Sequence, residues 1–355
     1  MTNNHKQTKL QIHLTNITGL GATKLLESIL PHIDGNQKFK TYEFHIPDKG
    51  NLSKYKAISK KTDTVIFKRN LPNAISRFLE CLFPNSRYDD GSPILVMGDL
   101  PLKLKKGNQV LFLQSSLLVK PWTDIPQLSS LKYIFSKIIF YINLRYVKAI
   151  IVQTSVMKEK LLSLYPSLNK KIHIISHPVP SWVKKEDFKS KEKSYSRSSK
   201  LSLIYPAAYY SHKNHKILTN ISCNGEDWPI SKMTLTIDER KNPNPSIDWI
   251  NCCGQIGHNR LLQEYYIADA LIFLSLEESF GFPLLEAMYL DLPILCSDLP
   301  FARILCGDNA IYFNPHDISS LRKKILELKE KLISGWTPDW SSQLKKIPKD
   351  WKTVA

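Results

Sequence analysis

Short apolar runs alternate with amphipathic segments along the whole chain. The apolar runs that predict strands in the first half are residues 9–16, 42–46, 63–67, 94–98, 109–114, 149–154 and 171–176. In the second half they are residues 201–206, 233–237, 249–254, 270–275, 293–297 and 310–313. Helical segments lie between several of these runs, among them residues 22–32, 131–147 and 157–165. This alternation predicts an α/β protein with parallel sheets built from strand–helix–strand units.

The alternation is interrupted once, near the middle of the chain. His177-Pro-Val-Pro180 stops regular structure, and residues 184–200 form a charged, Ser-rich run that is typical of a linker. We therefore predict a Rossmann-like domain at residues 1–176, a linker at 177–200 and a second Rossmann-like domain at 201–336. Doubly wound domains bind ligands at the carboxyl ends of their strands, so we expect the two domains to face each other across a cleft.

The composition is that of a globular protein with two cores. With 355 residues, 43% of them hydrophobic, the chain is long enough for two ordinary domains. It has no apolar run of about 18 residues, and its polar first residues precede no apolar stretch, so neither a membrane-spanning helix nor a secretory signal is expected. The six cysteines include no C-x-x-C pair, which favours reduced core residues over disulfides or metal ligands. These features predict a cytoplasmic protein.

The formal net charge of +17 at pH 7 indicates an anionic partner. No zinc-finger spacing, RNP-like motif or recognition-helix signature supports nucleic acid in that role. An anionic membrane surface is the other candidate, because the helical segment 131–146 combines aromatic and basic residues. The residues expected to bind it are Lys103, Lys105, Lys106, Lys132 and Lys137, with Tyr133 and Phe140 inserting. A core helix with lysines on its solvated side explains the segment equally well.

The stretch Glu278-Ser-Phe-Gly-Phe-Pro-Leu-Leu-Glu286 places two carboxylates eight positions apart around the start of a helix. Pro283 suits the first helical position, where its missing N–H costs nothing. Gly281 and Phe282 offer N–H groups at the positive end of the helix dipole, so an anionic group can approach closely. The two acids can accept hydrogen bonds from opposite ends of a long ligand. A helix start whose acids merely complement the dipole is the alternative.

Together with its flanking strands, this stretch resembles the Glu-x7-Glu motif of retaining glycosyltransferases of family 4, which have the two-domain GT-B fold. The resemblance is clearest over residues 201–315. It implies that Glu278 acts at the donor sugar and that Glu286 binds the nucleotide ribose. The residues whose backbone amides would meet the donor diphosphate are Phe280, Gly281 and Phe282. It also implies that the tail at residues 337–355 crosses back onto the first domain, anchored by its tryptophans.

Two further segments share the resemblance. Gly19 and Gly21 resemble the glycine loop that the family brings over the donor diphosphate, with a plain strand–helix turn as the alternative. Lys213 follows the strand at 201–206 and is expected to point its ammonium at the leaving diphosphate, with His212 beside it. An exposed lysine at a helix start is the alternative. The family usually has an Arg at the end of this strand, where this chain has Ala207 and Ala208.

The acceptor side also departs from the family. Many relatives carry a His after the central strand of the first domain, whereas this chain has Gln114 and Ser115, which can bind a sugar hydroxyl but cannot act as a base near neutral pH. Asp99 either meets the acceptor or forms a turn. His13, inside the first strand, is expected to be a core residue. No histidine pair or D-x-D motif indicates a metal site.

These observations predict a metal-independent, retaining hexosyltransferase that needs no cofactor. Its partners would be a nucleoside-diphosphate sugar as donor and a glycan acceptor, lipid-linked as in the biosynthesis of bacterial O-antigen, capsule or lipopolysaccharide. It would work in the cytoplasm or peripherally on the inner face of the cell membrane. Because the Arg and the His are missing, a catalytically silent sugar-nucleotide-binding or membrane-binding protein of the same fold is the alternative, and turnover separates the two.

Overall fold

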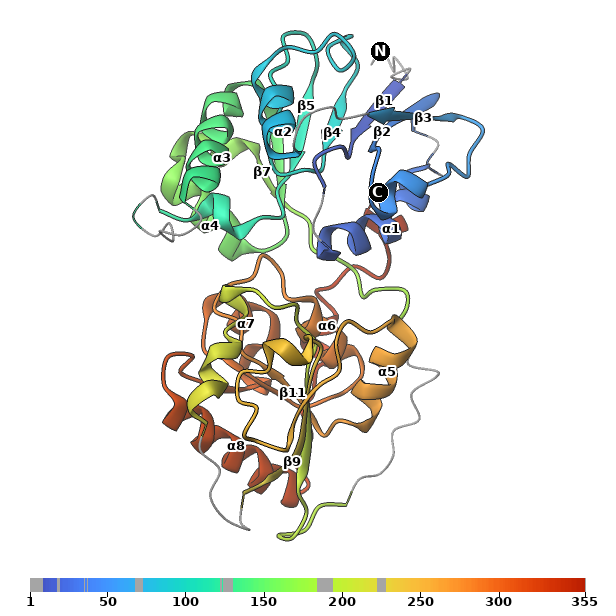
Figure 1. The fold of residues 1–355 in the computed structure, drawn as a ribbon. Coiled ribbons are helices and arrows are strands. Elements are labelled where there is room, and N and C mark those ends of the chain that lie inside the picture. The colour runs from blue at the N-terminus through green and yellow to red at the C-terminus, as the bar shows by residue number, and fades with distance from the viewer. Residues whose placement is uncertain are drawn as a thin grey trace. The chain divides into compact units, whose positions relative to one another are not determined.

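The computed structural model describes residues 9–17, 20–34, 36, 38–67, 73–121, 123, 130–183, 194–221 and 228–354. The chain divides into two compact units (Figure 1). The first unit comprises residues 1–177 and 350–355, and the second comprises residues 178–349. In each unit, helices cover both faces of one parallel sheet (Figure 1).

In the described part of the first unit, seven parallel strands lie in the order β3-β2-β1-β4-β5-β6-β7. The strands are β1 (Lys9–His13), β2 (Thr41–Pro47), β3 (Thr62–Phe67), β4 (Ile94–Val96), β5 (Gln109–Phe112), β6 (Val147–Val152) and β7 (Ile172–Ile174). The helices are α1 (Leu20–Asp34), α2 (Asn73–Leu82), α3 (Ser130–Asn143), α4 (Ser155–Leu164) and the terminal α10 (Trp351–Val354). Short 3-10 helices are η1 (Asn51–Lys54), η2 (Ser116–Val119), η5 (Leu144–Tyr146) and η6 (Pro166–Lys171).

In the described part of the second unit, six parallel strands lie in the order β10-β9-β8-β11-β12-β13. The strands are β8 (Leu201–Tyr205), β9 (Ile230–Leu235), β10 (Ile250–Cys252), β11 (Ala270–Phe273), β12 (Ile294–Ser297) and β13 (Ile311–Phe313). The helices are α5 (His258–Ile267), α6 (Phe282–Tyr289), α7 (Pro300–Cys306), α8 (Ile318–Ile333) and α9 (Ser341–Leu344). Short 3-10 helices are η7 (Ser211–Lys213), η8 (His215–Asn220), η9 (Glu239–Lys241) and η10 (Gly307–Asn309).

The strand order confirms the prediction of two doubly wound parallel-sheet domains. In each sheet the first strand in the chain lies in the middle, and the order reverses on either side of it. All residues of β11 and β12 are buried, which explains why these strands read as continuous apolar runs rather than alternating ones. The reversal points lie between β1 and β4 in the first sheet and between β8 and β11 in the second, and a ligand is expected at their carboxyl ends.

The described parts of the predicted linker belong to the second unit. Val183 is buried in the core of that unit, and Trp182 packs against the same core. The hydroxyl of Tyr195 donates a hydrogen bond to Asp269 Oδ1 at 3.0 Å. These residues of the predicted linker at 177–200 therefore pack as part of the second unit, because their large apolar side chains are worth more buried than solvated.

The second unit extends to residue 349, beyond the predicted end of the second domain at residue 336. Trp340 is buried in the second unit, where its Nε1 donates to the carbonyl of Leu292 at 3.2 Å. The chain joins the first unit only at Asp350. There α10 packs against α1, and Trp351 Nε1 donates to Ser28 Oγ at 3.0 Å. Trp340 thus fixes the tail to the second unit, and Trp351 fixes its end to the first unit.

Two α3 residues of the predicted membrane contact, Lys137 and Phe140, are buried in the structure. Lys137 is 1% exposed, and its ammonium donates a hydrogen bond to the carbonyl of Lys120. Phe140 is fully buried. Both side chains are buried against the rest of the first unit, so neither can reach a membrane, whereas Lys132 is exposed. None of the described helices has the length and hydrophobicity that a membrane crossing requires.

Candidate functional site

The loops that follow β8 and β11 meet at the reversal point of the second sheet. β8 and β11 are paired there, with Leu203 opposite Ala270 and Ile204 opposite Leu271. Beyond the strands, the Leu276 N–H donates to the carbonyl of His212 at 2.7 Å. The buried hydroxyl of Tyr205 donates to the carbonyl of Lys213 at 2.8 Å and pairs with Ser275 Oγ at 3.0 Å. These bonds hold the two loops together and fix where Lys213 leaves the backbone.

Lys213 and Glu278, both predicted from the sequence as catalytic, form an ion pair between Nζ and Oε1. Their side chains are 16% and 13% exposed, so the pair is shielded from most of the solvent yet still reachable. The low local dielectric makes this attraction stronger than that of a surface pair. The two residues come from different loops, 65 positions apart in the chain. The arrangement presents an ammonium and a carboxylate side by side at the carboxyl ends of the strands.

Aromatic rings surround the histidines of the same loop. His215, which the sequence did not single out, is buried, and its ring lies 5.0 Å from that of Tyr205 and 5.6 Å from that of Tyr209. Burial, with the nearby Lys213 charge, lowers the pKa of His215 to about 4, so the ring is neutral near pH 7. The ring of His212 stacks on that of Tyr210 at 5.6 Å and 7°. The neutral His215 ring therefore adds no positive charge beside Lys213.

The start of α6 forms the predicted phosphate corner. Gly281 has φ +97°, a left-handed conformation that suits glycine, and α6 begins directly after it at Phe282. A Cβ at this position would lie 3.2 Å from Leu284 Cδ1. Pro283 is the second residue of α6 rather than the first, and it still lies in the first turn, where its missing N–H costs nothing. Phe280 is buried, and its ring lies 5.4 Å from that of Phe282, so its side chain packs in the core while its backbone borders the corner.

Glu286 lies inside α6, where it is 6% exposed. Its Oε2 accepts a hydrogen bond from the hydroxyl of Tyr265 at 2.7 Å. Burial raises the pKa of Glu286 to about 7, and the Tyr265 bond opposes that rise. The carboxyl is therefore poised to change charge near neutral pH. Tyr265, on α5, was missed from the sequence because no pattern there indicates a partner for an acid 21 residues further along.

Two cations after β9 were also missed. The loop after β9 lies at the same sheet edge, since the Thr236 N–H donates to the carbonyl of Tyr205 at 3.4 Å. From this loop, the Lys241 ammonium lies 5.2 Å from the centre of the Tyr209 ring. The Arg240 guanidinium donates two hydrogen bonds to the Asp238 carboxylate, from Nε at 2.8 Å and from Nη2 at 2.9 Å. The run Asp-Glu-Arg-Lys after a predicted strand was the available signal for them.

The predicted acceptor residues of the first unit come together around a turn. Asp99 has φ +65°, and its Oδ1 accepts the N–H groups of Gln114 at 2.6 Å and Ser115 at 2.9 Å. Burial raises the pKa of Asp99, and these two hydrogen bonds oppose the rise. The bonds link the ends of β4 and β5, so the carboxylate has the turn-forming role that the sequence left open. Gln114 Nε2 makes a long contact of 3.4 Å to the carbonyl of Met97.

Of the predicted glycine loop, Gly19 lies outside the described residues. Gly21 lies in the first turn of α1, which begins at Leu20 rather than at residue 22. Near this loop, the end of β1 holds a buried polar cluster that the sequence did not show. His13 Nε2 lies 3.0 Å from Glu80 Oε1, which also accepts bonds from Thr15 at 3.0 Å and from Tyr88 at 2.6 Å. Glu80 lies on α2, a helix absent from the prediction, so its place could not be foreseen.

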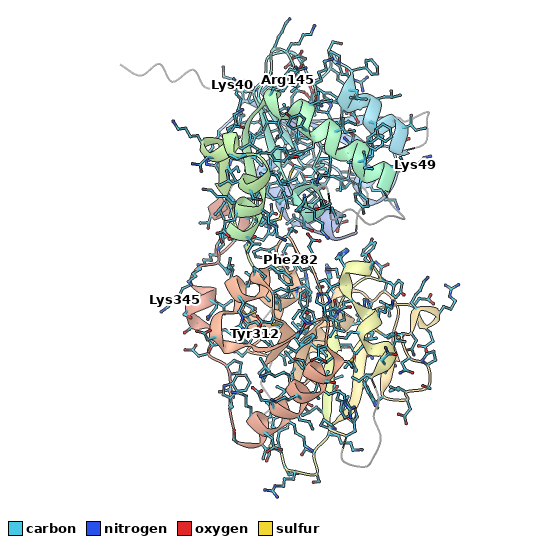
Figure 2. The ribbon with its side chains drawn as sticks, turned by 90° about the vertical axis from the view of Figure 1, so that its left-hand side faces the viewer. Lys40, Lys49, Arg145, Phe282, Tyr312 and Lys345 are labelled. Atoms are coloured by element: carbon cyan, nitrogen blue, oxygen red, sulfur yellow. The ribbon has the colours of Figure 1, made fainter. Side chains whose placement is uncertain are left out.

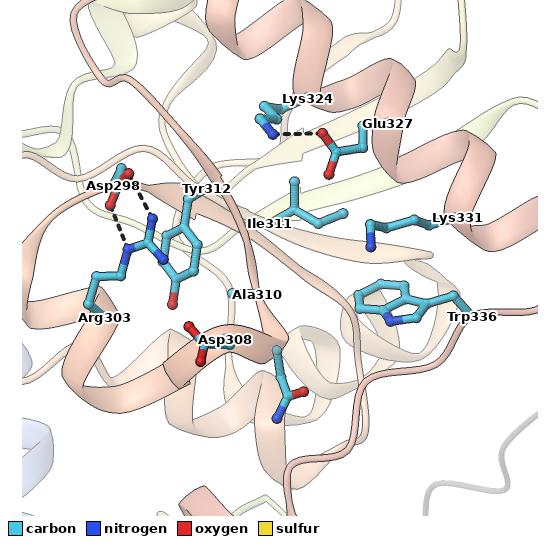
Figure 3. A pocket seen from close by; sticks show the side chains of 11 residues that line it. Asp298, Arg303, Asp308, Ala310, Ile311, Tyr312, Lys324, Glu327, Lys331 and Trp336 are labelled. Atoms are coloured by element: carbon cyan, nitrogen blue, oxygen red, sulfur yellow. Dashed lines mark hydrogen bonds and ion pairs between the residues drawn. The ribbon is translucent and has the colours of Figure 1, made fainter.

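A cavity of about 450 Å³ lies elsewhere in the second unit, along the outer strand β13 (Figure 3). Its charged side chains largely pair with one another: Arg303 donates to Asp298 at 2.7 and 2.8 Å, and Lys324 donates to Glu327 at 2.6 Å. The guanidinium of Arg303 also covers the ring of Tyr312 at 3.6 Å. None of the predicted site residues lines it. We therefore place the site at the β8–β11 reversal point, where a cation and the α6 N-terminus are available to a ligand.

Among the described residues, no cluster of three His, Cys, Asp or Glu side chains is arranged to hold a metal ion.

Known proteins resemble this chain in sequence and in fold. Residues 246–333, which include Glu278 and Glu286, match the family model of glycosyl transferases group 1. The O-antigen chain mannosyltransferase RfbU of Salmonella typhimurium is 23% identical over 209 residues, which cover 57% of each chain. The chain thus aligns with little more than half of this curated relative.

Solved structures match over nearly the whole chain. The sucrose-phosphate synthase of Thermosynechococcus elongatus has a TM-score of 0.61 at 13% identity, covering 98% of this chain and 94% of that one. Anabaena Alr3699/HepE in complex with UDP-glucose has a TM-score of 0.60 at 11% identity, covering 98% of this chain and 96% of that one. These likenesses confirm the predicted GT-B fold. The chain therefore has a two-unit GT-B fold, and residues 246–333 of its second unit match the model of glycosyl transferases group 1.

Proposed function

We propose that this chain is a glycosyltransferase of surface-polysaccharide biosynthesis, which moves a hexose from a nucleoside-diphosphate sugar to a glycan acceptor. The observation that carries the proposal is the Lys213–Glu278 ion pair at the reversal point of the second sheet. The group 1 match at residues 246–333 and the similarity to an O-antigen mannosyltransferase support the same reaction.

The pair has a defined part in the proposed reaction. Lys213 and the N–H groups at the start of α6 stabilise the charge that grows on the diphosphate as the bond from sugar C1 to the phosphate oxygen breaks. In the free protein the Lys213 ammonium is paired with Glu278, so the diphosphate takes over part of that interaction when it binds. Glu278 then accepts hydrogen bonds from the donor sugar. Glu286 accepts hydrogen bonds from the ribose hydroxyls.

The proposed transfer retains the configuration at C1. The acceptor oxygen attacks from the face that the phosphate leaves, and the leaving phosphate oxygen takes the acceptor proton. No protein base is then needed, which agrees with Gln114 and Ser115 where many family 4 enzymes have a histidine. The proposal also needs no metal, because Lys213 and the α6 N-terminus supply the positive charge.

The identities of donor and acceptor extend the proposal. Mannose is the first sugar to test, because a relative is named an O-antigen chain mannosyltransferase. The acceptor is proposed to be a lipid-linked glycan on the inner face of the cell membrane. The net charge of +17 supports work at such a surface, because anionic lipids attract basic residues.

Two measurements test the proposal. Thermal unfolding with a panel of nucleoside diphosphates should show stabilisation by one of them, since ligand at about 100 times its Kd adds roughly 2.7 kcal/mol. Mass spectrometry should then detect transfer from the matching nucleotide sugar to a glycan acceptor. Binding without transfer to any acceptor would favour a catalytically silent protein, which Ala207 and Ala208 in place of the usual Arg also favour. Absence of nucleotide binding would overturn both.

A further inference from the structure

Two neighbouring helices of the first unit present large apolar side chains to solvent. On α3, Leu131, Phe135, Ile138 and Ile142 recur at the spacing of one helical face and are 71%, 53%, 39% and 42% exposed. On and just beyond α2, Ile75, Leu79 and Phe83 follow each other at intervals of four and are 52%, 38% and 62% exposed. We call these seven residues the α2–α3 face.

The two stripes form one surface because α2 and α3 lie side by side (Figures 1 and 2). The rings of Phe78 and Phe135 are 6.2 Å apart, and Asn143 Nδ2 donates to the carbonyl of Cys81 at 2.8 Å, which joins the carboxyl ends of the helices. The face holds seven of the sixteen exposed large hydrophobic residues in the described part of the chain. Contiguous exposed apolar surface of this kind indicates a binding partner.

The exposed charges of α2 and α3 themselves are of one sign, and beside them Asp89 accepts hydrogen bonds from the N–H groups of Lys105 and Lys106. The sequence from Ser130 to Lys148 contains no Asp or Glu. The only acid between Asn73 and Phe83 is Glu80, which is buried and bonded to His13. Exposed cations lie at the ends of α3. Lys132 belongs to its first turn. Arg145, labelled in Figure 2, follows its last turn.

Two more cations lie beside the carboxyl ends of these helices. Asn143 Nδ2 also donates to the carbonyl of Pro101 at 2.8 Å, which brings up the loop that carries the exposed Lys105 and Lys106. An apolar face with a positive rim matches a bilayer that contains anionic lipids, in which apolar residues enter the acyl boundary and cations meet phosphates. A second copy of the chain fits less well, because a two-fold interface would bring like charges together.

We propose that the α2–α3 face docks the first unit reversibly on an anionic lipid bilayer. The inference rests on the proposed function, since a lipid-linked acceptor would lie in that bilayer. It replaces the buried Lys137 and Phe140 of the sequence-based prediction with residues that reach the surface. It also gives a use to part of the excess positive charge, which binding a nucleotide sugar does not require.

Co-sedimentation tests the docking, with vesicles of phosphatidylcholine alone and vesicles that also contain phosphatidylglycerol. The double variant Lys132→Gln, Arg145→Gln should bind the anionic vesicles about 25-fold more weakly at low salt, since each cation contributes roughly fivefold. The double variant Phe135→Ser, Ile142→Ser should lose binding by about tenfold or more, because both side chains are exposed and leave the core intact. Matched controls on α8, Lys323→Gln and Leu326→Ser, should bind as the unaltered protein does.

The outcomes separate this inference from the proposed function. Stabilisation by nucleoside diphosphates should be the same in all four variants, because none of the altered residues lies in the second-unit site. Full nucleotide binding with no attachment of the unaltered protein to anionic vesicles would overturn the docking alone. Equal loss in the α8 controls would also overturn it, since the charge or hydrophobicity of the whole protein would then explain attachment. Sedimentation velocity that shows dimers dispersed by Phe135→Ser, Ile142→Ser without vesicles would assign the face to self-association instead.

Discussion

At the scale of single residues, Lys213 carries the largest expected effect on the reaction. Its ammonium is held by Glu278 in a pair that is mostly shielded from solvent, next to where charge would grow on the leaving diphosphate. We expect Lys213→Ala to lower kcat on the order of 100-fold or more, as the loss of a preorganised charge stabiliser does. The matched control is Lys216→Ala in the next turn of chain, where the side chain is exposed. Steady-state kinetics on both variants measures the difference, with Tm recorded to exclude unfolding.

The same charge argument extends to metals. If Lys213 and the α6 N-terminus neutralise the diphosphate, EDTA should leave the rate of the unaltered protein nearly intact. A rate abolished by EDTA and restored by Mg²⁺ would mean that a metal carries that charge instead.

A Lys216→Ala variant slower than Lys213→Ala would show that the wrong lysine was chosen.

Glu286 gives a residue-scale test that depends on pH. Its pKa of about 7 means that the carboxyl is half protonated near neutrality, whereas ribose hydroxyls donate to the ionised form. Nucleoside diphosphate should therefore bind more tightly as pH rises from about 6 to about 8, by up to tenfold for each pH unit below the pKa. Glu286→Gln should weaken binding at the higher pH by about 1.5 to 3 kcal/mol, the contribution of hydrogen bonds to a charged group.

Calorimetry on both proteins at both pH values decides the point. The nucleotide phosphate titrates in the same range, but that contribution is common to the two proteins and cancels in their difference. An identical pH dependence in Glu286→Gln would mean that the carboxyl serves only as the partner of Tyr265.

At the scale of elements, the turn into α6 depends on one glycine. Gly281 adopts φ +97°, and a Cβ there would press on Leu284. Gly281→Ala should lower the free energy of unfolding by about 1 to 2 kcal/mol, the cost of a left-handed conformation for an L-residue. It should also weaken nucleotide binding, because the added methyl stands beside the N–H groups that would meet the phosphate.

Gly257 at the start of α5 provides the matched control. Its φ is −76°, and a Cβ there would meet nothing within 4 Å. Because Gly257 is the N-cap of α5, where alanine is less favourable than glycine, Gly257→Ala should lower the free energy of unfolding by only about 0.5 kcal/mol. Urea unfolding of the two variants gives the comparison, and equal small effects would show that the α6 turn tolerates a side chain.

The elements also show where sequence reasoning succeeds and where it stops. All the strands were predicted, because burial on both faces makes strands such as β11 and β12 continuous apolar runs between turns. Helix α2 was not among the helices named from the sequence, although Ile75, Phe78, Leu79 and Leu82 recur at the spacing of one helical face. Glu278 and Glu286 were singled out by a local motif and Lys213 by its place after a predicted strand, and their roles stay predictions. Tyr265 and Glu80 were not singled out, since their roles arise only when distant segments pack together.

At the scale of the whole molecule, the two units bury titratable groups whose effects on stability have different signs. In the first unit, burial lowers the pKa of His45 and of His177 to about 3. In the second unit, burial lowers the pKa of His215 to about 4 but raises that of Glu286 to about 7. Unfolded histidine titrates near pH 6.5, so each buried histidine loses stability as pH falls below about 6.5 toward its folded pKa. Glu286 does the reverse, because its folded form holds a proton that the unfolded form has released between about pH 4.5 and 7.

These signs lead to different acid responses. Between about pH 6.5 and pH 5, the first unit should lose up to about 1.4 kcal/mol per pH unit for each of His45 and His177. In the second unit, the losses at His215 should be offset by the gain at Glu286, so its stability should change little. Hydrogen exchange followed by mass spectrometry reports on peptides of each unit separately. Glu286→Gln removes the offset and should make the second unit respond to acid through His215 alone, while the first unit responds as before. Parallel responses of both units in the unaltered protein, or an unchanged second unit in Glu286→Gln, would mean that Glu286 does not hold its proton in the folded state.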